Sequence, residues 1–274
     1  MILSALATIV LASVLPYQAG TFALLGGSPQ IVAKFWATQG AGTSYTLNAR
    51  QFAKSGTPIK AYDIDMQHYM HVVIVRDDFR EFAHKHPSYN AGTGTFETSF
   101  TKQPNHKYYV YADSMPHGIG QQVFRFTIEN DGTPAAVKPP STASGPNSKA
   151  GPYTVTLAKT TLRANAPQNV DLTVENDDDP ADDLVPYLGA PAHVVLINVK
   201  TLDYVHAHPL LRGQTSSQMS SANEMKEMVG SNKAGPFMKL MLPALPPGVY
   251  AAWVQVAGGK ERTVYTAPFT LVAR

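Results

Sequence analysis

Cysteine is absent from the 274 residues of this chain. Disulfide bonds, thiolate metal ligands and cysteine nucleophiles are therefore excluded, and any bound metal must be held by nitrogen, oxygen or thioether ligands. An excess of charge is lacking too, because 22 Lys and Arg side chains nearly balance 20 Asp and Glu side chains, and no cluster of five basic residues occurs. Nucleic acids and anionic lipids are thus not expected as partners.

The N-terminal segment lacks charged side chains altogether, since the first one along the chain is Lys34. The apolar run before Pro16 has the length of a signal-peptide core and is shorter than the roughly 20 residues of a membrane-spanning helix. No basic residue precedes the run and no clean small-x-small cleavage motif follows it. A retained membrane anchor and a buried helix are therefore alternatives. We predict that residues 1–26 form a signal peptide or a membrane anchor, and that the protein is periplasmic or extracellular.

A stretch rich in proline, glycine and serine, residues 133–152, has the composition of a linker. It separates two segments, 43–132 and 153–274, that contain the same histidine pattern. In each segment a histidine is followed 13 and 15 residues later by the two histidines of a His-x-His-Pro motif. The two triplets are His71, His84 and His86, and His193, His206 and His208. The identical spacing predicts two homologous domains.

Short segments rich in β-branched and aromatic residues recur through both halves, separated by Gly, Pro, Asn and Asp. Examples are residues 108–111, 153–157, 170–174, 194–199 and 249–256. Several such strands in each half favour a sandwich. The expected fold is all-β, with two tandem β-sandwich domains, immunoglobulin-like or cupredoxin-like, after the apolar leader. A short helical insertion is expected near residues 216–229.

Each histidine triplet is expected to lie on one β-hairpin. Two histidines at positions i and i+2 of a strand point to the same face, because side chains alternate along a strand. A turn at residues 77–78 places the first histidine of the first triplet opposite the second, and a turn at residues 78–79 places it opposite the third. In the second triplet, a turn near residues 199–201 leaves the same two registers. Either register gathers three imidazoles on one face.

Three converging imidazoles suit copper or zinc, whose bonds to imidazole nitrogen are about 2.0 Å long. Cross-strand Cβ atoms lie about 4.5–5.5 Å apart, so the rings of one face can reach a shared ion. The first half has further candidate ligands, because Met66, His68 and Met70 share a strand face if their segment is extended. Thioether together with imidazole favours copper, particularly Cu(I). The alternatives are hydrogen-bonded histidines at a sandwich rim and methionines that fill the core.

At these residues the chain resembles a known family. The segment from Asp78 to Pro87, Asp-Phe-Arg-Glu-Phe-Ala-His-Lys-His-Pro, follows a histidine-containing strand and precedes the pair Ala112-Asp113. It is similar to bacterial secreted and membrane-anchored proteins described as heavy-metal-binding or copper-binding, although His106 replaces the glycine of their Gly-x-Tyr step. The second half resembles the companion domain of these proteins, with Ala192 in place of a common glycine. The resemblance implies export, a sandwich fold and a heavy-metal ligand.

The sequence contains no Gly-rich phosphate loop, nucleophile elbow or His-Glu-x-x-His motif, so we expect no enzymatic activity. The leading hypothesis is an exported protein that buffers, carries or delivers copper or zinc. Its partner would be a membrane or periplasmic metal-handling protein, or another copy of the chain. The alternative is a structural, adhesive or complex-assembly module with architectural histidines. If only one triplet binds metal, we expect it to be the first, because additional ligands surround it.

Overall fold

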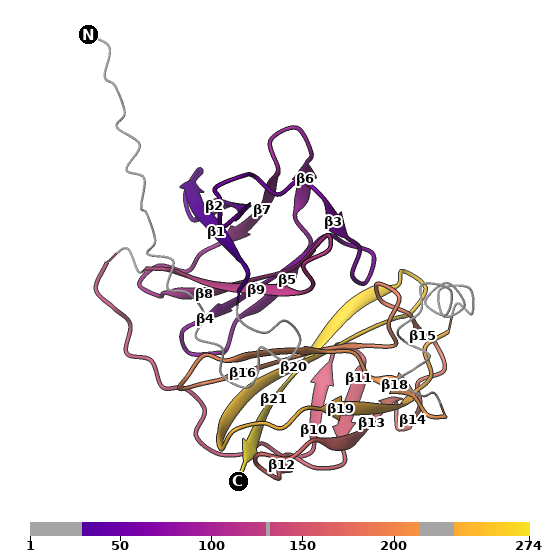
Figure 1. Cartoon of the computed structure of the whole chain (residues 1–274). Coiled ribbons are helices and arrows are strands. Elements are labelled where there is room, and N and C mark those ends of the chain that lie inside the picture. The colour runs from indigo at the N-terminus through magenta and orange to yellow at the C-terminus, as the bar shows by residue number, and fades with distance from the viewer. Residues whose placement is uncertain (1–28, 130–131, 214–232) are drawn as a thin grey trace. The chain divides into compact units, whose positions relative to one another are not determined.

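The computed structural model describes residues 29–129, 132–213 and 233–274 (Figure 1). The chain divides into two compact units, of which one runs up to Lys138 and the other continues from Pro139. Each unit contains two β-sheets. The all-β fold with two tandem sandwiches is therefore confirmed.

The predicted leader, residues 1–26, and the predicted helix at residues 216–229 lie outside the described residues. Within the part of the chain that is described, no helix has the length and apolar character needed to span a membrane.

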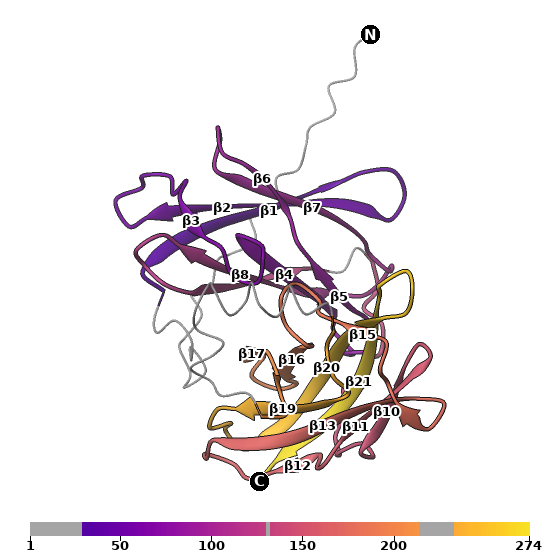
Figure 2. The same cartoon turned by 90° about the vertical axis from the view of Figure 1, so that its right-hand side faces the viewer.

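The first unit packs two sheets face to face. One sheet has the strand order β1-β2-β7-β6, and the other has the order β3-β8-β4-β5 with β9 paired to β8. Figure 2 shows β1, β2, β6 and β7 as one layer, with β8, β4 and β5 in the layer beneath it. The strands are β1 (Ile31–Gln39), β2 (Ser44–Ala53), β3 (Tyr62–Asp63), β4 (Met70–Arg76), β5 (Phe82–Lys85), β6 (Ser88–Asn90), β7 (Thr95–Thr101), β8 (Tyr108–Pro116) and β9 (Gln122–Ile128).

The N-terminal boundary of the first sandwich lies earlier than predicted. On β1, Ile31, Ala33 and Phe35 are buried while the residues between them are exposed, as expected for a strand with one face on a core. The Phe35 ring stacks on Phe126 of the opposite sheet with ring centroids 4.2 Å apart. Strand β1 also pairs with β2 along its whole length. The domain therefore includes β1 from Ile31 onward, and the predicted start at residue 43 was wrong.

The second unit repeats this plan with two larger sheets. One has the order β10-β11-β13-β19-β18 with β14 paired to β13, and the other has the order β12-β21-β20-β16-β17 with β15 paired to β20. The strands are β10 (Asn147–Ala150), β11 (Tyr153–Leu157), β12 (Thr161–Leu162), β13 (Gln168–Asn176), β14 (Asp179–Pro180), β15 (Leu184–Val185), β16 (His193–Asn198), β17 (Tyr204–Ala207), β18 (Leu210–Leu211), β19 (Phe237–Leu242), β20 (Gly248–Gly258) and β21 (Thr263–Ala273).

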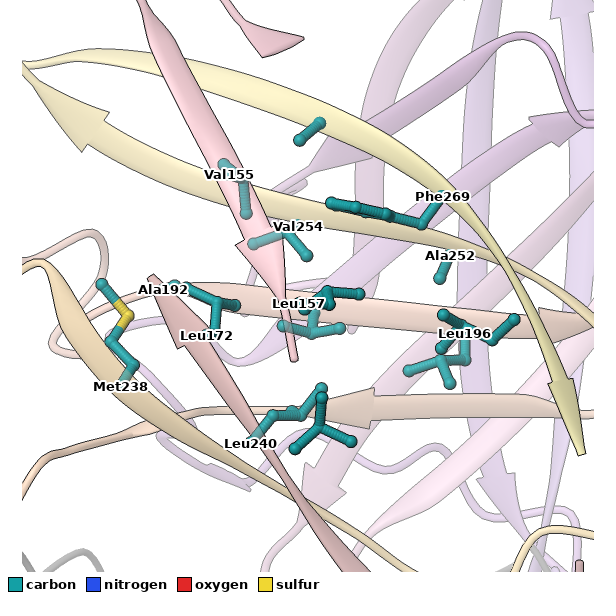
Figure 3. Packing of buried hydrophobic residues seen from close by; sticks show 14 of the residues in the cluster. Val155, Leu157, Leu172, Ala192, Leu196, Met238, Leu240, Ala252, Val254 and Phe269 are labelled. Carbon is teal, nitrogen blue, oxygen red and sulfur yellow. The ribbon is translucent and has the colours of Figure 1, made fainter. Parts of the chain in front are cut away.

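Side chains from both sheets of the second unit meet in a single core (Figure 3). Val155, Leu172 and Leu240 come from one sheet, and Leu196 and Phe269 come from the other; all five are at most 4% exposed. Burying one such side chain contributes about 1.5–3 kcal/mol. The interior can therefore stabilise this sandwich without any disulfide bond.

The linker is shorter than the predicted span, residues 133–152. Residues 132–146 contain no strand, but Asn147–Ala150 form β10, which pairs with β11 in register. Ala150 is fully buried in the core of the second unit. Proline and glycine flank β10 on both sides, so their density in the sequence conceals a four-residue strand that contains neither of them.

Candidate metal centre

Both histidine triplets lie on hairpins with the same register. In the first hairpin, β4 pairs with β5 so that Val73 faces His84, which corresponds to a turn at residues 78–79. In the second, β16 pairs with β17 so that Val195 faces His206. Continuing either ladder by two residues brings the first histidine of the triplet opposite the third. The structure thus selects one of the two registers that the sequence allowed.

The three histidine rings of the first hairpin lie together. The centroid of the His71 ring is 5.2 Å from that of His84 and 5.0 Å from that of His86, and the last two rings are 4.7 Å apart. One ring nitrogen from each histidine lies within 4.8 Å of the other two. These three residues therefore form a group that could hold a metal ion.

The backbone fixes the tautomer of His71. Its Nε2 lies 3.0 Å from the carbonyl oxygen of Asp65, and because a carbonyl only accepts hydrogen bonds, Nε2 carries the proton. In the neutral ring the lone pair is then on Nδ1, which lies 3.1 Å from Nε2 of His84. Ligating histidines commonly donate their second N–H to a carbonyl in this way. The Nδ1 atom of His71 is therefore the ligand that the fold presents.

The spacing of the two facing nitrogens suits a shared ion. Two nitrogens bound at about 2.0–2.1 Å with a near-tetrahedral angle lie about 3.3–3.4 Å apart. The observed separation of Nδ1 of His71 and Nε2 of His84 is 3.1 Å, close to this value. An ion between them would replace the hydrogen bond that the same two atoms make.

The second hairpin repeats both of these hydrogen bonds. Nε2 of His193 lies 2.9 Å from the carbonyl oxygen of Tyr187, and its Nδ1 lies 3.2 Å from Nε2 of His206. The ring of His208 completes the group, with its centroid 4.6 Å from each of the other two. The homology inferred from spacing therefore extends to the hydrogen bonds that orient the rings.

A tight turn supplies the orienting carbonyl in each unit. Asp65 and His68 form an isolated antiparallel bridge across Met66 and Gln67, whose φ angles are 41° and 70°. The turn from Tyr187 to Ala190 has the same form, with positive φ at both central residues. Two adjacent positive φ values are typical of a type I′ turn.

His68 joins the first group from the end of its turn. Its ring stacks on that of His86 with centroids 4.1 Å apart, and it lies edge-on to the ring of His71 at 6.1 Å. Burial lowers the pKa of His68, and the neighbouring His71 lowers it further, which favours the neutral ring that can ligate. The matching position in the second unit is Ala190, which offers no ligand. The extra histidine thus stacks against the group through His86.

The strand face predicted for Met66, His68 and Met70 does not exist. The segment is not extended, because Met66 occupies the left-handed turn. Met70 is on β4, but it packs in the core with Val72, on the face opposite to His71. The condition for a thioether and imidazole set on one strand face is therefore not met, and Met70 fills the core, which was the alternative interpretation. The sequence indicates the turn of the second unit through Gly189, but the turn from Asp65 to His68 contains no glycine that would indicate it.

Two carboxylates beside His71 were not included among the predicted site residues. Asp113 lies directly opposite His71 on β8 and is 1% exposed. Burial raises the pKa of Asp113 to about 6, against the lowering effects of Gln121 and His71. Gln121 donates through Nε2 to both carboxylate oxygens, at 2.8 and 2.9 Å. Burial likewise raises the pKa of Asp65, with a further rise from Asp113 and an opposing effect of His71.

The two remaining histidines of the first half are each paired with an aspartate. Nδ1 of His106 lies 2.7 Å from Asp77 in a partly buried site, a pairing that no local sequence pattern predicts. Nδ1 of the exposed His117 lies 2.7 Å from Asp63, which raises the pKa of His117. Neither belongs to the histidine group around His71.

Comparisons with known proteins give a family but no function. No curated protein matches the chain. A solved structure of β-glucuronidase from Parabacteroides merdae, with glycerol in its active site, shows 8% identity and a TM-score of 0.20 over 90% of this chain, which spans 25% of the enzyme. So low a score supports no conclusion about fold or activity. The sequence profile described as "Domain of unknown function (DUF8832)" matches residues 34–132 and 148–274. The chain belongs to this family.

Proposed function

We propose that this protein is an exported metal-binding protein that buffers, carries or delivers copper or zinc. Its first centre is the group His71, His84 and His86 with His68 nearby, and its second is His193, His206 and His208. The observation that carries the proposal is the orientation of His71, whose Nε2 is held by a carbonyl while Nδ1 faces His84. A second, homologous hairpin preserves this detail.

The ligand set supports copper or zinc over harder cations. Neutral imidazoles suit zinc, copper and nickel, whereas calcium and magnesium require oxygen ligands. Each hairpin brings two ring nitrogens face to face, and the chain has no thiol to compete. Three ligands that leave a coordination position open suit an ion that must be acquired and released.

Export and transfer rest on the sequence. The uncharged apolar segment 1–26 and the resemblance to secreted heavy-metal-binding proteins support a periplasmic or extracellular location, with membrane attachment as the alternative. A membrane or periplasmic metal-handling protein would then receive the ion. We propose no catalytic turnover for either centre.

A metal titration tests the proposal. Chelator-treated protein is titrated with Zn(II), and the bound metal is counted by mass spectrometry of the intact chain. We expect up to two ions per chain, fewer in H84A/H86A or H206A/H208A, and none when all four substitutions are combined. His117→Ala is the matched control, because it removes a histidine that is paired with Asp63 outside the hairpins. Unchanged stoichiometry in the fourfold variant would overturn the proposal.

A structural role for the histidines is the competing function, and one observation favours it. His71 already hydrogen bonds to His84 and to the Asp65 carbonyl without any ion. The melting temperature separates the two functions, because an ion at 100 times its Kd adds about 2.7 kcal/mol to the stability of the state that binds it. An architectural cluster would melt at one temperature with or without chelator.

A further inference from the structure

The two histidine centres differ in charge at equivalent positions of the fold. The strand next to the first hairpin places Asp113 opposite His71. The strand next to the second hairpin places Gln255 opposite His193. Both residues are buried, at 1% and 6% exposure. An acid in one unit is therefore replaced by a neutral amide in the other.

A second position shows the same difference. The turn residue whose carbonyl accepts the hydrogen bond from Nε2 is Asp65 in the first unit and Tyr187 in the second. The carboxylates of Asp65 and Asp113 interact electrostatically with each other and with His71. In the second unit the Tyr187 ring lies against His193 with centroids 5.0 Å apart. The first centre thus has two acidic neighbours, where the second has a phenol and an amide.

We propose that the two centres select ions of different charge, with a divalent ion at the His71 centre and a monovalent ion at the His193 centre. This inference rests on the proposed metal-binding function. Three neutral imidazoles leave the whole charge of a bound ion uncompensated. At the first centre, two nearby carboxylates balance the charge of a 2+ ion. At the second centre, which has no such carboxylates, a 1+ ion such as Cu(I) leaves a smaller uncompensated charge than a 2+ ion.

The physical reason is that electrostatic energy scales with the product of the charges. Removing one carboxylate therefore costs a divalent ion about twice as much binding free energy as a monovalent ion at the same place. A buried ion without a counter-charge is strongly disfavoured. Asp113 sets the preference, because it is the more buried of the two acids.

The experiment compares Zn(II) with Ag(I), a monovalent ion that does not change its oxidation state during the titration. Each centre is isolated in the full chain by removing the other, with H206A/H208A for the first and H84A/H86A for the second. Asp113→Asn in the first centre should weaken Zn(II) binding on the order of 10- to 100-fold, as changes beside metal ligands do. The corresponding loss for Ag(I) should be about 3- to 10-fold, since the charge is half.

The reciprocal variant provides an independent arm. Gln255→Glu in the isolated second centre should raise the affinity for Zn(II) relative to that for Ag(I), and it remains informative if Asp113→Asn fails to fold. A purely structural effect would lower the affinities for both ions by the same factor and leave their ratio unchanged. The inference would be overturned if the ratio of Zn(II) affinity to Ag(I) affinity were unchanged in both variants. It would also be overturned if the wild-type first centre favoured Ag(I) over Zn(II) more strongly than the second centre does. If neither ion binds to either isolated centre, the proposed function itself has failed.

Discussion

Replacing the buried Asp113 by asparagine should stabilise the metal-free protein near neutral pH. The carboxyl is completely enclosed, and burial raises its pKa from 3.8 to about 6. Each pKa unit corresponds to about 1.4 kcal/mol, so keeping this group ionised in the folded state costs about 3 kcal/mol. The asparagine removes that charge and retains an oxygen that can accept the hydrogen bond from Gln121.

The effect should depend on pH in a definite direction. The folded state holds the proton of Asp113 more tightly than the unfolded state, so it binds more protons between about pH 3.8 and pH 6. The contribution of Asp113 to the unfolding free energy of the wild type therefore falls as pH rises through this window, and above the window the whole cost is present. Asp113→Asn should be more stable than the wild type by up to about 3 kcal/mol at about pH 8, and by close to nothing at about pH 4.

The measurement is urea unfolding of the chelator-treated protein, followed by hydrogen exchange on peptides from β4 and β8 so that only the first unit is observed. Gln121→Leu is a useful companion, because it removes the donor to both oxygens of Asp113 and should destabilise the unit at about pH 8. An asparagine variant that is less stable than the wild type at about pH 8 would refute the reasoning. An advantage of equal size at both pH values would refute it as well.

Three further predictions address the fold and the centres. Zn(II) affinity should fall steeply below about pH 6 as protons compete for the imidazoles, which a competing chromophoric chelator can measure; a flat profile would point to non-histidine ligands. His68→Ala should lower the Zn(II) affinity of the isolated first centre, and Ala190→His should raise the Zn(II) affinity of the second, as measured by isothermal titration calorimetry. Unchanged affinities in both variants would exclude a fourth histidine ligand. Phe126→Ala should destabilise the first unit by about 3–5 kcal/mol in urea unfolding, because it empties the space against Phe35, and a loss below about 1 kcal/mol would contradict the packing described.

The hairpins could be predicted from sequence because their information is local. Strand alternation puts histidines two apart on one face, and a short turn leaves only two registers. Alignment of the two halves also matches Tyr108 with Tyr250, and the structure places these residues at equivalent positions, opposite Arg76 and Asn198. These relations needed no knowledge of how the sheets pack.

The carboxylate beside His71 could not be found in this way. Asp113 reaches His71 because β8 pairs with β4, and the two residues are 42 positions apart in the sequence. The resemblance pointed to the Ala112-Asp113 pair without giving it a role. Only the sheet register turns that pair into a neighbour of the metal ligands.

Alignment of the two halves of the sequence also failed to identify the buried residues where the alignment is shifted by one position along a strand. When the two halves of the sequence are aligned, Gly94-Thr-Phe96 matches Gly235-Pro-Phe237, yet Phe96 is buried and Phe237 is 40% exposed. Met238, the next residue, is the one that enters the core of the second unit. The period of two makes a shift of one residue reverse the inside and outside of a strand.

Anomalous diffraction from crystals of the zinc-loaded protein tests the metal-binding function most directly, because it locates the ion relative to the histidine nitrogens. We predict an anomalous peak about 2.0–2.1 Å from Nδ1 of His71 and from Nε2 of His84. Nε2 of His71 should remain hydrogen bonded to the Asp65 carbonyl, as it is without the ion. An ion bound only at surface carboxylates, with His71 and His84 still hydrogen bonded to each other, would contradict metal binding by the hairpins.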